Sequence, residues 1–207
     1  MQELRALQAA ARAHTRRVAR LDRYLLGRGS EQKQEQPLVR ADGASYVHYQ
    51  KGALTLYALQ DAIGEPAIDD AISAFLKRWH FAGPPFARSV DLLAEFRRVT
   101  PAPLQPLIAD LFEAITLYDV RAIDAVATRR TDGRHDVEVH LAAKKLHADG
   151  AGNETEVPFD TAVDVGVLDA QGNVLAPAST CCVRATTACA WSSRACPHRP
   201  GSIRCTS

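Results

Sequence analysis

Cysteine and methionine are scarce in this sequence, and neither is spread along the chain. Methionine occurs once, at Met1, and all five cysteines lie after residue 180. An odd number of cysteines in one short segment does not make a regular disulfide framework. The same segment lacks the two matching C-x2-C halves of a common structural zinc site. The cysteines therefore indicate neither a disulfide scaffold nor a cysteine-bound metal.

Long apolar runs and a large excess of charge are missing as well. No uninterrupted apolar stretch approaches the roughly 20 residues that a membrane-spanning helix needs. The first residues also lack the apolar core of a signal peptide. The net charge of +1 favours neither nucleic acid nor an anionic membrane as a partner. We therefore expect this 207-residue chain to be soluble as written and to bind no nucleic acid, while its localisation stays open.

The first 117 residues place apolar side chains at helical spacing. Five helices are predicted from this spacing, beginning near residues 3, 45, 65, 89 and 104. Gly27 and Gly29 are expected to end the first helix, because glycine is unfavourable inside a helix. Ser89 is expected to cap the fourth helix, since its hydroxyl can accept a hydrogen bond from a free backbone N–H.

From about Tyr118 the apolar spacing changes from helical to a period of two, which is typical of strands. Helices followed by strands, without strand–helix alternation, indicate an α+β chain with two domains. We predict a helical domain over residues 1–117 and a small, incomplete antiparallel β domain over residues 118–176. The alternating side chains are Ile123, Ala125 and Ala127, then Val137, Val139 and Leu141, then Val163, Val165 and Val167.

The alternation stops after Leu175, and residues 177–207 show no period of either kind. Codons can be chosen for residues 191–207 that, when read two nucleotides later, encode a strand-like stretch ending in Gly-Leu-Asp-Pro-Leu-His-Lys. We interpret residues 177–207 as the product of a shifted reading frame and expect them to be disordered. The alternative is a genuine cysteine-rich tail, which the spacing of the cysteines disfavours.

A polar and aromatic segment, Tyr46-Val-His-Tyr-Gln-Lys-Gly-Ala53, stands at the start of the second predicted helix. Taken by itself, the segment is a helix start with two tyrosines packed at its edge. Lysine side chains are mostly exposed, so we expect Lys51 to be solvated. His48 could orient a substrate, although a histidine beside tyrosines is more commonly a partly buried side chain.

The same segment resembles the aminopeptidase N family of zinc metallopeptidases, the gluzincin aminopeptidases. The resemblance covers about residues 3–176 and is carried first by Tyr49-Gln-Lys-Gly-Ala53, an apolar helix and Ile63-Gly-Glu65. Residues 25–31 are similar to a bacterial branch of the family whose peptidase part is often joined to a transporter-like membrane segment. Further similar segments are Phe75-Leu-Lys-Arg78, Phe81-Ala-Gly-Pro-Pro85, Asp91-Leu-Leu-Ala-Glu-Phe96, Asp110-Leu-Phe-Glu113 and Leu117-Tyr-Asp119.

The resemblance implies a fold and a role for one residue. Residues 1–117 would be the helical C-terminal part of a thermolysin-like catalytic domain, followed by a β-sandwich-like domain. Tyr49 would be catalytic, because the tyrosine of this motif donates a hydrogen bond to the tetrahedral intermediate of peptide hydrolysis. A phenol with a pKa near 10 keeps its proton at neutral pH and can act in this way. The family acts on peptides and uses zinc.

The zinc-binding residues of that family have no counterpart in this sequence. It contains no His-Glu-x-x-His and no Gly-x-Met-Glu-Asn element. His135 and His140 are separated by an odd number of positions on a predicted strand and so face opposite ways. His147 is expected to be solvated near a turn. The remaining histidines, His14, His80 and His198, have no partner at ligand spacing. We therefore expect no zinc in this chain alone and an upstream catalytic half that is missing from it.

Three functional hypotheses stay open. The chain is a fragment of a metalloaminopeptidase that removes N-terminal residues from peptides and is inactive alone. It is a non-catalytic helical and β module that binds a partner through helix faces that the missing half would cover. Or it is one half of an enzyme that a separate upstream polypeptide completes in trans. The resemblance also implies a parent protein that is linked to a membrane.

Overall fold

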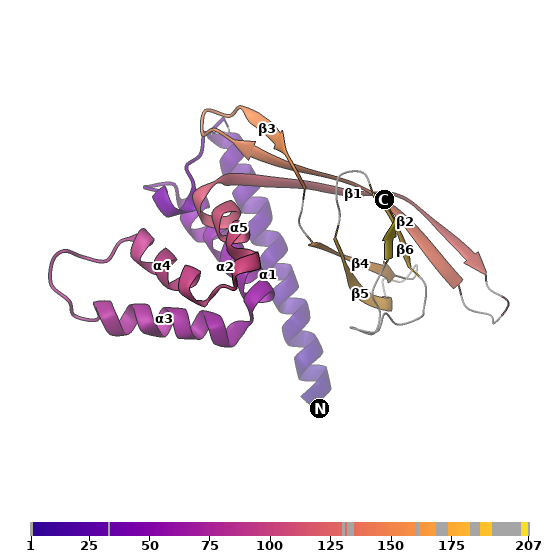
Figure 1. Ribbon diagram of the computed structural model, residues 1–207, viewed down its shortest axis with the longest axis horizontal. Helices are drawn as coiled ribbons and strands as arrows, with labels where there is room; N and C mark the ends of the chain where they lie inside the picture. The colour runs from indigo at the N-terminus through magenta and orange to yellow at the C-terminus, as the bar shows by residue number, and fades with distance from the viewer. Residues whose placement is uncertain are drawn as a thin grey trace. The chain divides into compact units, whose positions relative to one another are not determined.

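The computed structural model describes residues 2–32, 34–129, 131, 135–159, 162–168, 174–182, 187–191 and 204–206. Its helices come first and its antiparallel strands follow, so the predicted α+β class is confirmed (Figure 1). The chain divides into two compact units. One comprises Met1–Thr116 with His147–Glu154, and the other comprises Leu117–Leu146 with Thr155–Ser207.

Helix α1 runs over Gln2–Ser30, which is longer than its glycines predict. Gly27 does not end the helix, because it lies where another segment approaches: a Cβ atom added to it would stand 2.5 Å from the Cβ of Tyr46. The prediction that Gly27 and Gly29 stop this helix was therefore wrong, and Gly27 serves close packing instead. Neither α1 nor any other described helix is long and apolar enough to cross a membrane.

The helix predicted near Ser45 forms in two parts. Tyr46–Lys51 makes one turn of π-helix, η2, and Gly52–Ile63 continues as α2. Gly64, with φ of 88°, ends α2 in a conformation that glycine adopts without strain. Helix α3, Glu65–Trp79, starts at once and carries a proline in its first turn, where a missing N–H costs nothing.

Helix α4 spans Ser89–Val99 but is not capped by Ser89 as predicted. The Asp91 carboxylate accepts the backbone N–H of Arg88 at 2.8 Å. The Ser89 hydroxyl instead donates to the carbonyl of Val39 at 2.6 Å, which ties α4 to the short helix over Leu38–Arg40. The remaining helical turns of the unit are η1 (Leu38–Arg40), η3 (Ala102–Leu104), α5 (Gln105–Ile108) and η4 (Ala109–Glu113).

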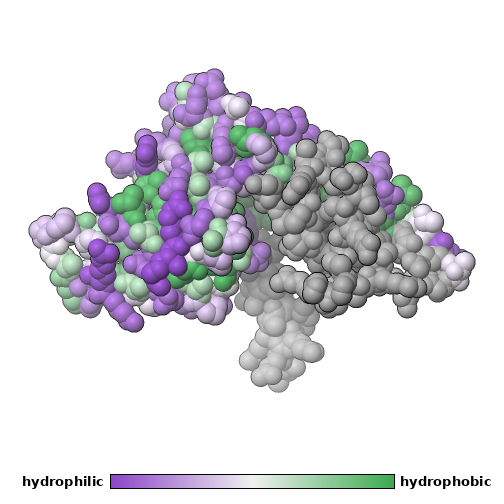
Figure 2. Space-filling model, viewed as in Figure 1, coloured by the Kyte–Doolittle hydropathy of each residue, from purple (hydrophilic) through white to green (hydrophobic). Residues whose placement is uncertain are grey.

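The helices of the first unit close around an apolar core of their own. Helices α3 and α4 lie side by side (Figure 1), and the rings of Phe96 and Phe112 are 5.6 Å apart between their centroids. Each fully buried side chain of this kind contributes roughly 1.5–3 kcal/mol to folding. Figure 2 shows further apolar surface between polar side chains over the helices. The buried core residues are Leu59, Ile68, Ala71, Leu93, Phe96, Ile108 and Phe112.

The strands differ in how far they follow the predicted period of two. The inward face of β2, His135–Ala148, carries Val139, Leu141 and Ala143, which pack with Phe159. Strand β1, Ile115–Arg129, begins slightly before the predicted change at Tyr118. Its predicted alternating residues Ile123, Ala125 and Ala127 are exposed, as are the residues between them. One sheet has the order β1-β2-β6-β7 with β3 paired to β2, and the other pairs β4 with β5. The other strands are β3 (Glu154–Val157), β4 (Ala162–Leu168), β5 (Val174–Cys182), β6 (Thr187–Trp191) and β7 (Arg204–Thr206).

Part of the predicted disordered tail differs from the prediction. Strand β5 continues through residues 177–182 and pairs Cys181 with Val163 of β4, while β6 pairs Cys189 with Val139 of β2. Strand pairing uses backbone groups, so a segment without an apolar period can still complete a sheet. Residues 183–186, 192–203 and 207 of the tail lie outside the described residues.

Candidate functional site

The tyrosine motif lies on an unusual piece of backbone. In η2 the N–H of Gly52 donates to the carbonyl of Val47, five residues back, in place of the four of an α-helix. Single π-turns of this kind are rare and are found often at functional sites. The turn therefore sets the side chains of the motif apart from those of the regular helix α2 that follows.

The two sides of this turn differ sharply in exposure. Tyr49 is 65% exposed, whereas Lys51 is only 8% exposed. Residues two apart on a helix do not face the same way, so one side chain points outward and the other into the unit. The expectation that Lys51 is solvated was wrong, because its Nζ lies 2.6 Å from Oε1 of Glu35.

Glu35 is the centre of a buried polar cluster. Its side chain is fully buried and accepts hydrogen bonds from the Tyr24 hydroxyl at 2.9 Å, from Nε of Arg28 at 3.0 Å and from Lys51. Arg28 also donates to Glu154 at 3.2 Å. A buried charge is tolerated only when it is paired and hydrogen-bonded, and two cations here face two carboxylates. We call Tyr24, Arg28, Glu35, Lys51 and Glu154 the Glu35 cluster.

Tyr24 acts in this cluster as a permanent hydrogen-bond donor. Burial, and then the negative charge of Glu35, raise the pKa of the Tyr24 phenol well above its usual range. The same two causes raise the pKa of Tyr46. The Tyr24 ring also stacks on that of Tyr46 at 6.2 Å between centroids, and Nζ of Lys51 lies 5.4 Å from its centre. The cluster therefore ties α1 to η2 through both charges and rings.

A largely apolar hollow of about 460 Å³ adjoins Tyr49. The His48 and Tyr49 rings are 4.4 Å apart between centroids, and Nη1 of Arg20 donates to the Tyr49 carbonyl at 3.1 Å. An apolar hollow with a few hydrogen-bonding groups has the composition of a small-ligand site. Its apolar lining is Leu38, Val39, Gly52, Ala53, Leu56, Leu92, Leu93, Phe96 and Phe112, and its polar lining is Arg20, His48, Tyr49 and Ser89.

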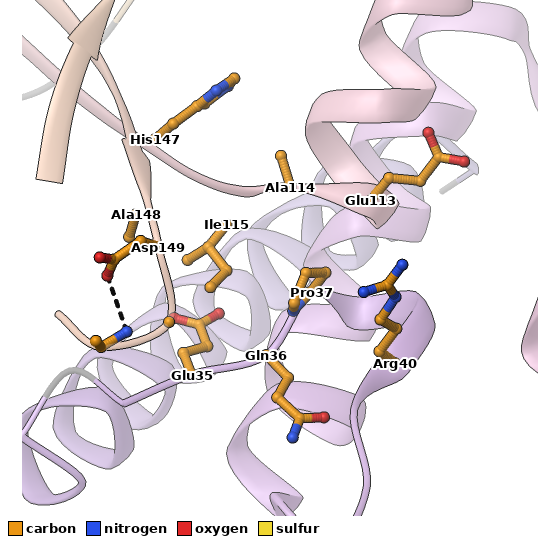
Figure 3. A pocket seen from close by; sticks show the side chains of 12 residues that line it. Glu35, Gln36, Pro37, Arg40, Glu113, Ala114, Ile115, His147, Ala148 and Asp149 are labelled. Carbon is orange, nitrogen blue, oxygen red and sulfur yellow. Dashed lines mark hydrogen bonds between the residues drawn. The ribbon is translucent and has the colours of Figure 1, made fainter. Parts of the chain in front are cut away.

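A second and more polar hollow, of about 710 Å³, lies elsewhere in the first unit (Figure 3). Three segments line it: one from Glu35 to Arg40, one from Glu113 to Ile115 and one from His147 to Ala151. His147 is not simply solvated as expected, since its Nε2 lies 3.2 Å from a carboxylate oxygen of Asp110. Tyr49 is not among the residues that line this hollow, so it is separate from the motif.

The histidines do not assemble into a metal site in the described part of the chain. No group of three or more histidine, cysteine, aspartate or glutamate side chains there could hold an ion. His80 stacks on Phe81, and His140 pairs with the exposed carboxylates of Asp124 and Glu138. A catalytic zinc site normally needs three protein ligands, and the described residues supply no such set. The side chains of His14, His135 and His198 lie outside the described ones.

Glu35 is the residue of this site that the sequence did not reveal. It stands in a polar stretch that reads as irregular loop, 16 residues before Lys51. Tyr24 and Arg28 do carry a local signal, because they are four apart on α1 and so share one face among apolar neighbours. A partner for that polar face could have been expected from this spacing.

Comparison of the chain with protein-family models, with curated proteins and with solved structures finds no match.

Proposed function

We propose that this chain is the tyrosine-bearing part of a zinc-dependent metalloaminopeptidase, which removes N-terminal residues from peptides. Residues 1–117 would form the helical part of a thermolysin-like catalytic domain. The observation that carries the proposal is the outward-facing Tyr49 of Tyr-x-Lys-Gly-Ala, 65% exposed beside an apolar hollow. Its phenol is open to a bound peptide, while the other side of the same turn is buried.

The chemical role of Tyr49 is that of a hydrogen-bond donor. When water adds to a peptide carbonyl, negative charge gathers on the carbonyl oxygen, and a donor held nearby stabilises it. Removing one such donor typically lowers kcat by about 10²–10³-fold. His48, whose ring contacts that of Tyr49, would border the same substrate.

The zinc ligands and the general base are not supplied by this chain in the proposal. The sequence has no His-Glu-x-x-His, and the described residues offer no three-ligand cluster. These groups would come from polypeptide outside this sequence, and the chain would be inactive without it. The similarity of residues 25–31 to the transporter-linked branch favours a membrane-linked parent.

The test is hydrolysis of aminoacyl anilides by the purified chain, alone and mixed with the polypeptide encoded upstream. We expect no turnover by the chain alone and zinc-dependent turnover by the mixture. Tyr49→Phe should lower kcat by about 10²–10³-fold. Tyr57→Phe, a half-exposed tyrosine on α2, is the matched control and should leave it unchanged. Chelator-sensitive turnover by the chain alone would show that no second polypeptide is needed.

One observation favours a second candidate, a non-catalytic module that binds a partner. Helix α1 exposes Val18, Leu21 and Leu25 at 44%, 45% and 51%, and their spacing places them on one stripe. Such a stripe suits the apolar face of another polypeptide. A partner that binds the chain equally well after Tyr49→Phe, with no turnover in any mixture, would favour this candidate.

A further inference from the structure

Little holds the Tyr49 ring itself. It is mostly exposed, and the one ring that it contacts in the described residues belongs to its neighbour His48. The backbone of η2 therefore sets where the Tyr49 side chain leaves the turn and on which side of it the phenol lies. Whatever fixes that turn fixes this placement.

Three polar side-chain contacts hold the turn in the described residues. Two are exposed hydrogen bonds that compete with water: Arg20 donates to the Tyr49 carbonyl, and the Tyr46 hydroxyl donates to the carbonyl of Gln34 at 2.9 Å. The third is the ion pair between Lys51 and Glu35, whose side chains are 10% and 0% exposed. Breaking a buried pair of this kind is far more costly than losing an exposed contact, so the ion pair is the strongest of the three.

The ion pair also supplies direction, which the apolar contacts of the turn do not. Val47 is fully buried and anchors η2 by burial, but the hydrophobic effect is non-directional. The 2.6 Å contact between Nζ of Lys51 and Oε1 of Glu35 instead requires the Lys51 side of the turn to face the buried carboxylate. With Lys51 facing inward, Tyr49 on the other side of the turn faces outward.

We propose that Glu35, acting through Lys51, is a positioning residue for Tyr49. The pair holds η2 in its π-helical turn, and the turn aims the phenol toward the apolar hollow. The proposal rests on the proposed function for what Tyr49 does there. The claim about how Tyr49 is placed does not depend on the proposed function, so the placement of Tyr49 and its chemical role can be tested separately.

The test is the NMR signal of Tyr49 in the full chain labelled with 13C-tyrosine. The chain has five tyrosines, and Tyr49→Phe identifies the signal by its loss. In Lys51→Met we expect the Tyr49 signal to shift or to split into several. In Lys51→Arg, which keeps the positive charge, the Tyr49 signal should lie close to its position in the unaltered chain. Tyr24→Phe is the matched control, because it removes a donor to the same carboxylate but keeps the Tyr24 ring, and it should leave the Tyr49 signal in place.

A second variant guards against loss of folding. Glu35→Gln with Lys51→Met removes both charges and leaves Arg28 paired with Glu154, so no unmatched buried charge remains. We expect the Tyr49 signal to move in this double variant too. An unchanged signal in either variant, with helical circular dichroism intact, overturns the proposal. Failure of both variants to fold overturns it as well, since the pair would then be structural only.

Activity in the mixture with the upstream polypeptide adds an independent readout. A donor displaced by about 1 Å can cost about 10²-fold in rate, so Lys51→Met should lower kcat by up to that factor and leave KM unchanged. Absence of activity in the unaltered mixture would refute the proposed function, while the NMR result would stand. A shifted Tyr49 signal with unchanged kcat would refute the positioning role.

Discussion

Two clusters of charged side chains in the described residues differ in their access to water. In the first unit, the side chains of Glu35, Arg28 and Lys51 at the centre of the Glu35 cluster are 0%, 8% and 10% exposed. In the second unit His140 lies between Asp124 and Glu138, and these side chains are 41%, 57% and 50% exposed. Similar chemical groups thus have different effects. The buried Glu35 cluster holds the backbone in place, whereas the exposed carboxylates around His140 only shift the protonation equilibrium of its ring.

The largest expected effect comes from breaking the buried set. Glu35→Ala leaves Arg28 and Lys51 without their shared carboxylate, and removing one partner of a buried pair costs about 3–5 kcal/mol. We expect the free energy of unfolding, measured by urea denaturation of the full chain, to fall by that amount. Glu138→Ala is the matched change in the exposed set and should leave it nearly unaltered. Equal losses of unfolding free energy in the two variants would contradict the difference between the buried and the exposed cluster.

A smaller effect should follow from crowding the contact between α1 and η2. Gly27→Ala places a Cβ atom 2.5 Å from the Cβ of Tyr46, so the helix or the turn must shift. Overpacking of this kind typically costs about 1–3 kcal/mol. Gly29→Ala meets nothing within 4 Å and should instead gain about 0.5–1 kcal/mol from helix propensity. The midpoint of thermal unfolding of both variants measures this difference. A higher midpoint for Gly27→Ala would contradict the close contact between Gly27 and Tyr46.

The smallest effect belongs to the exposed set and depends on pH. The hydrogen bond and charge of Asp124 raise the pKa of His140 above its ordinary value of about 6.5. Because the folded pKa is raised, this contribution to stability is fully present below about pH 6.5 and is lost as the pH rises through the folded value. An NMR titration should therefore give a His140 midpoint above 6.5, and Asp124→Asn should lower it. A titration midpoint that Asp124→Asn leaves unchanged would show that Asp124 does not raise the pKa of His140.

Spacing of apolar residues was enough to predict the helices and the strands. Ile68 and Ala71 of α3, and Val139 and Leu141 of β2, lie on the buried faces that their periods indicate. These predictions succeed where the periodic face meets a core. Ile123 of β1 has the same period and is 63% exposed, so the period predicts the strand but not its burial. The α+β class follows from the same pattern.

The errors occur where a distant partner decides. Gly27 looked like a helix stop, because nothing in its neighbourhood announces the approach of Tyr46. Lys51 looked solvated, because Glu35 stands in a stretch without any period. Ser89 looked like a cap, although its hydroxyl is taken by the carbonyl of Val39. In each of the three cases the residue type has a common local role, and a contact with a residue distant in the sequence gives it a rarer one.

Burial of the Lys51 and Glu35 pair has a consequence for the conditions in which Tyr49 can work. Dissolved ions screen charges over a length that falls from about 10 Å at 0.1 M salt to about 3 Å at 1 M, but they reach exposed groups far more than buried ones. The exposed His140 set should weaken across that range. The turn that carries Tyr49 should keep its geometry, which makes the direction of the phenol indifferent to the ionic strength of its surroundings.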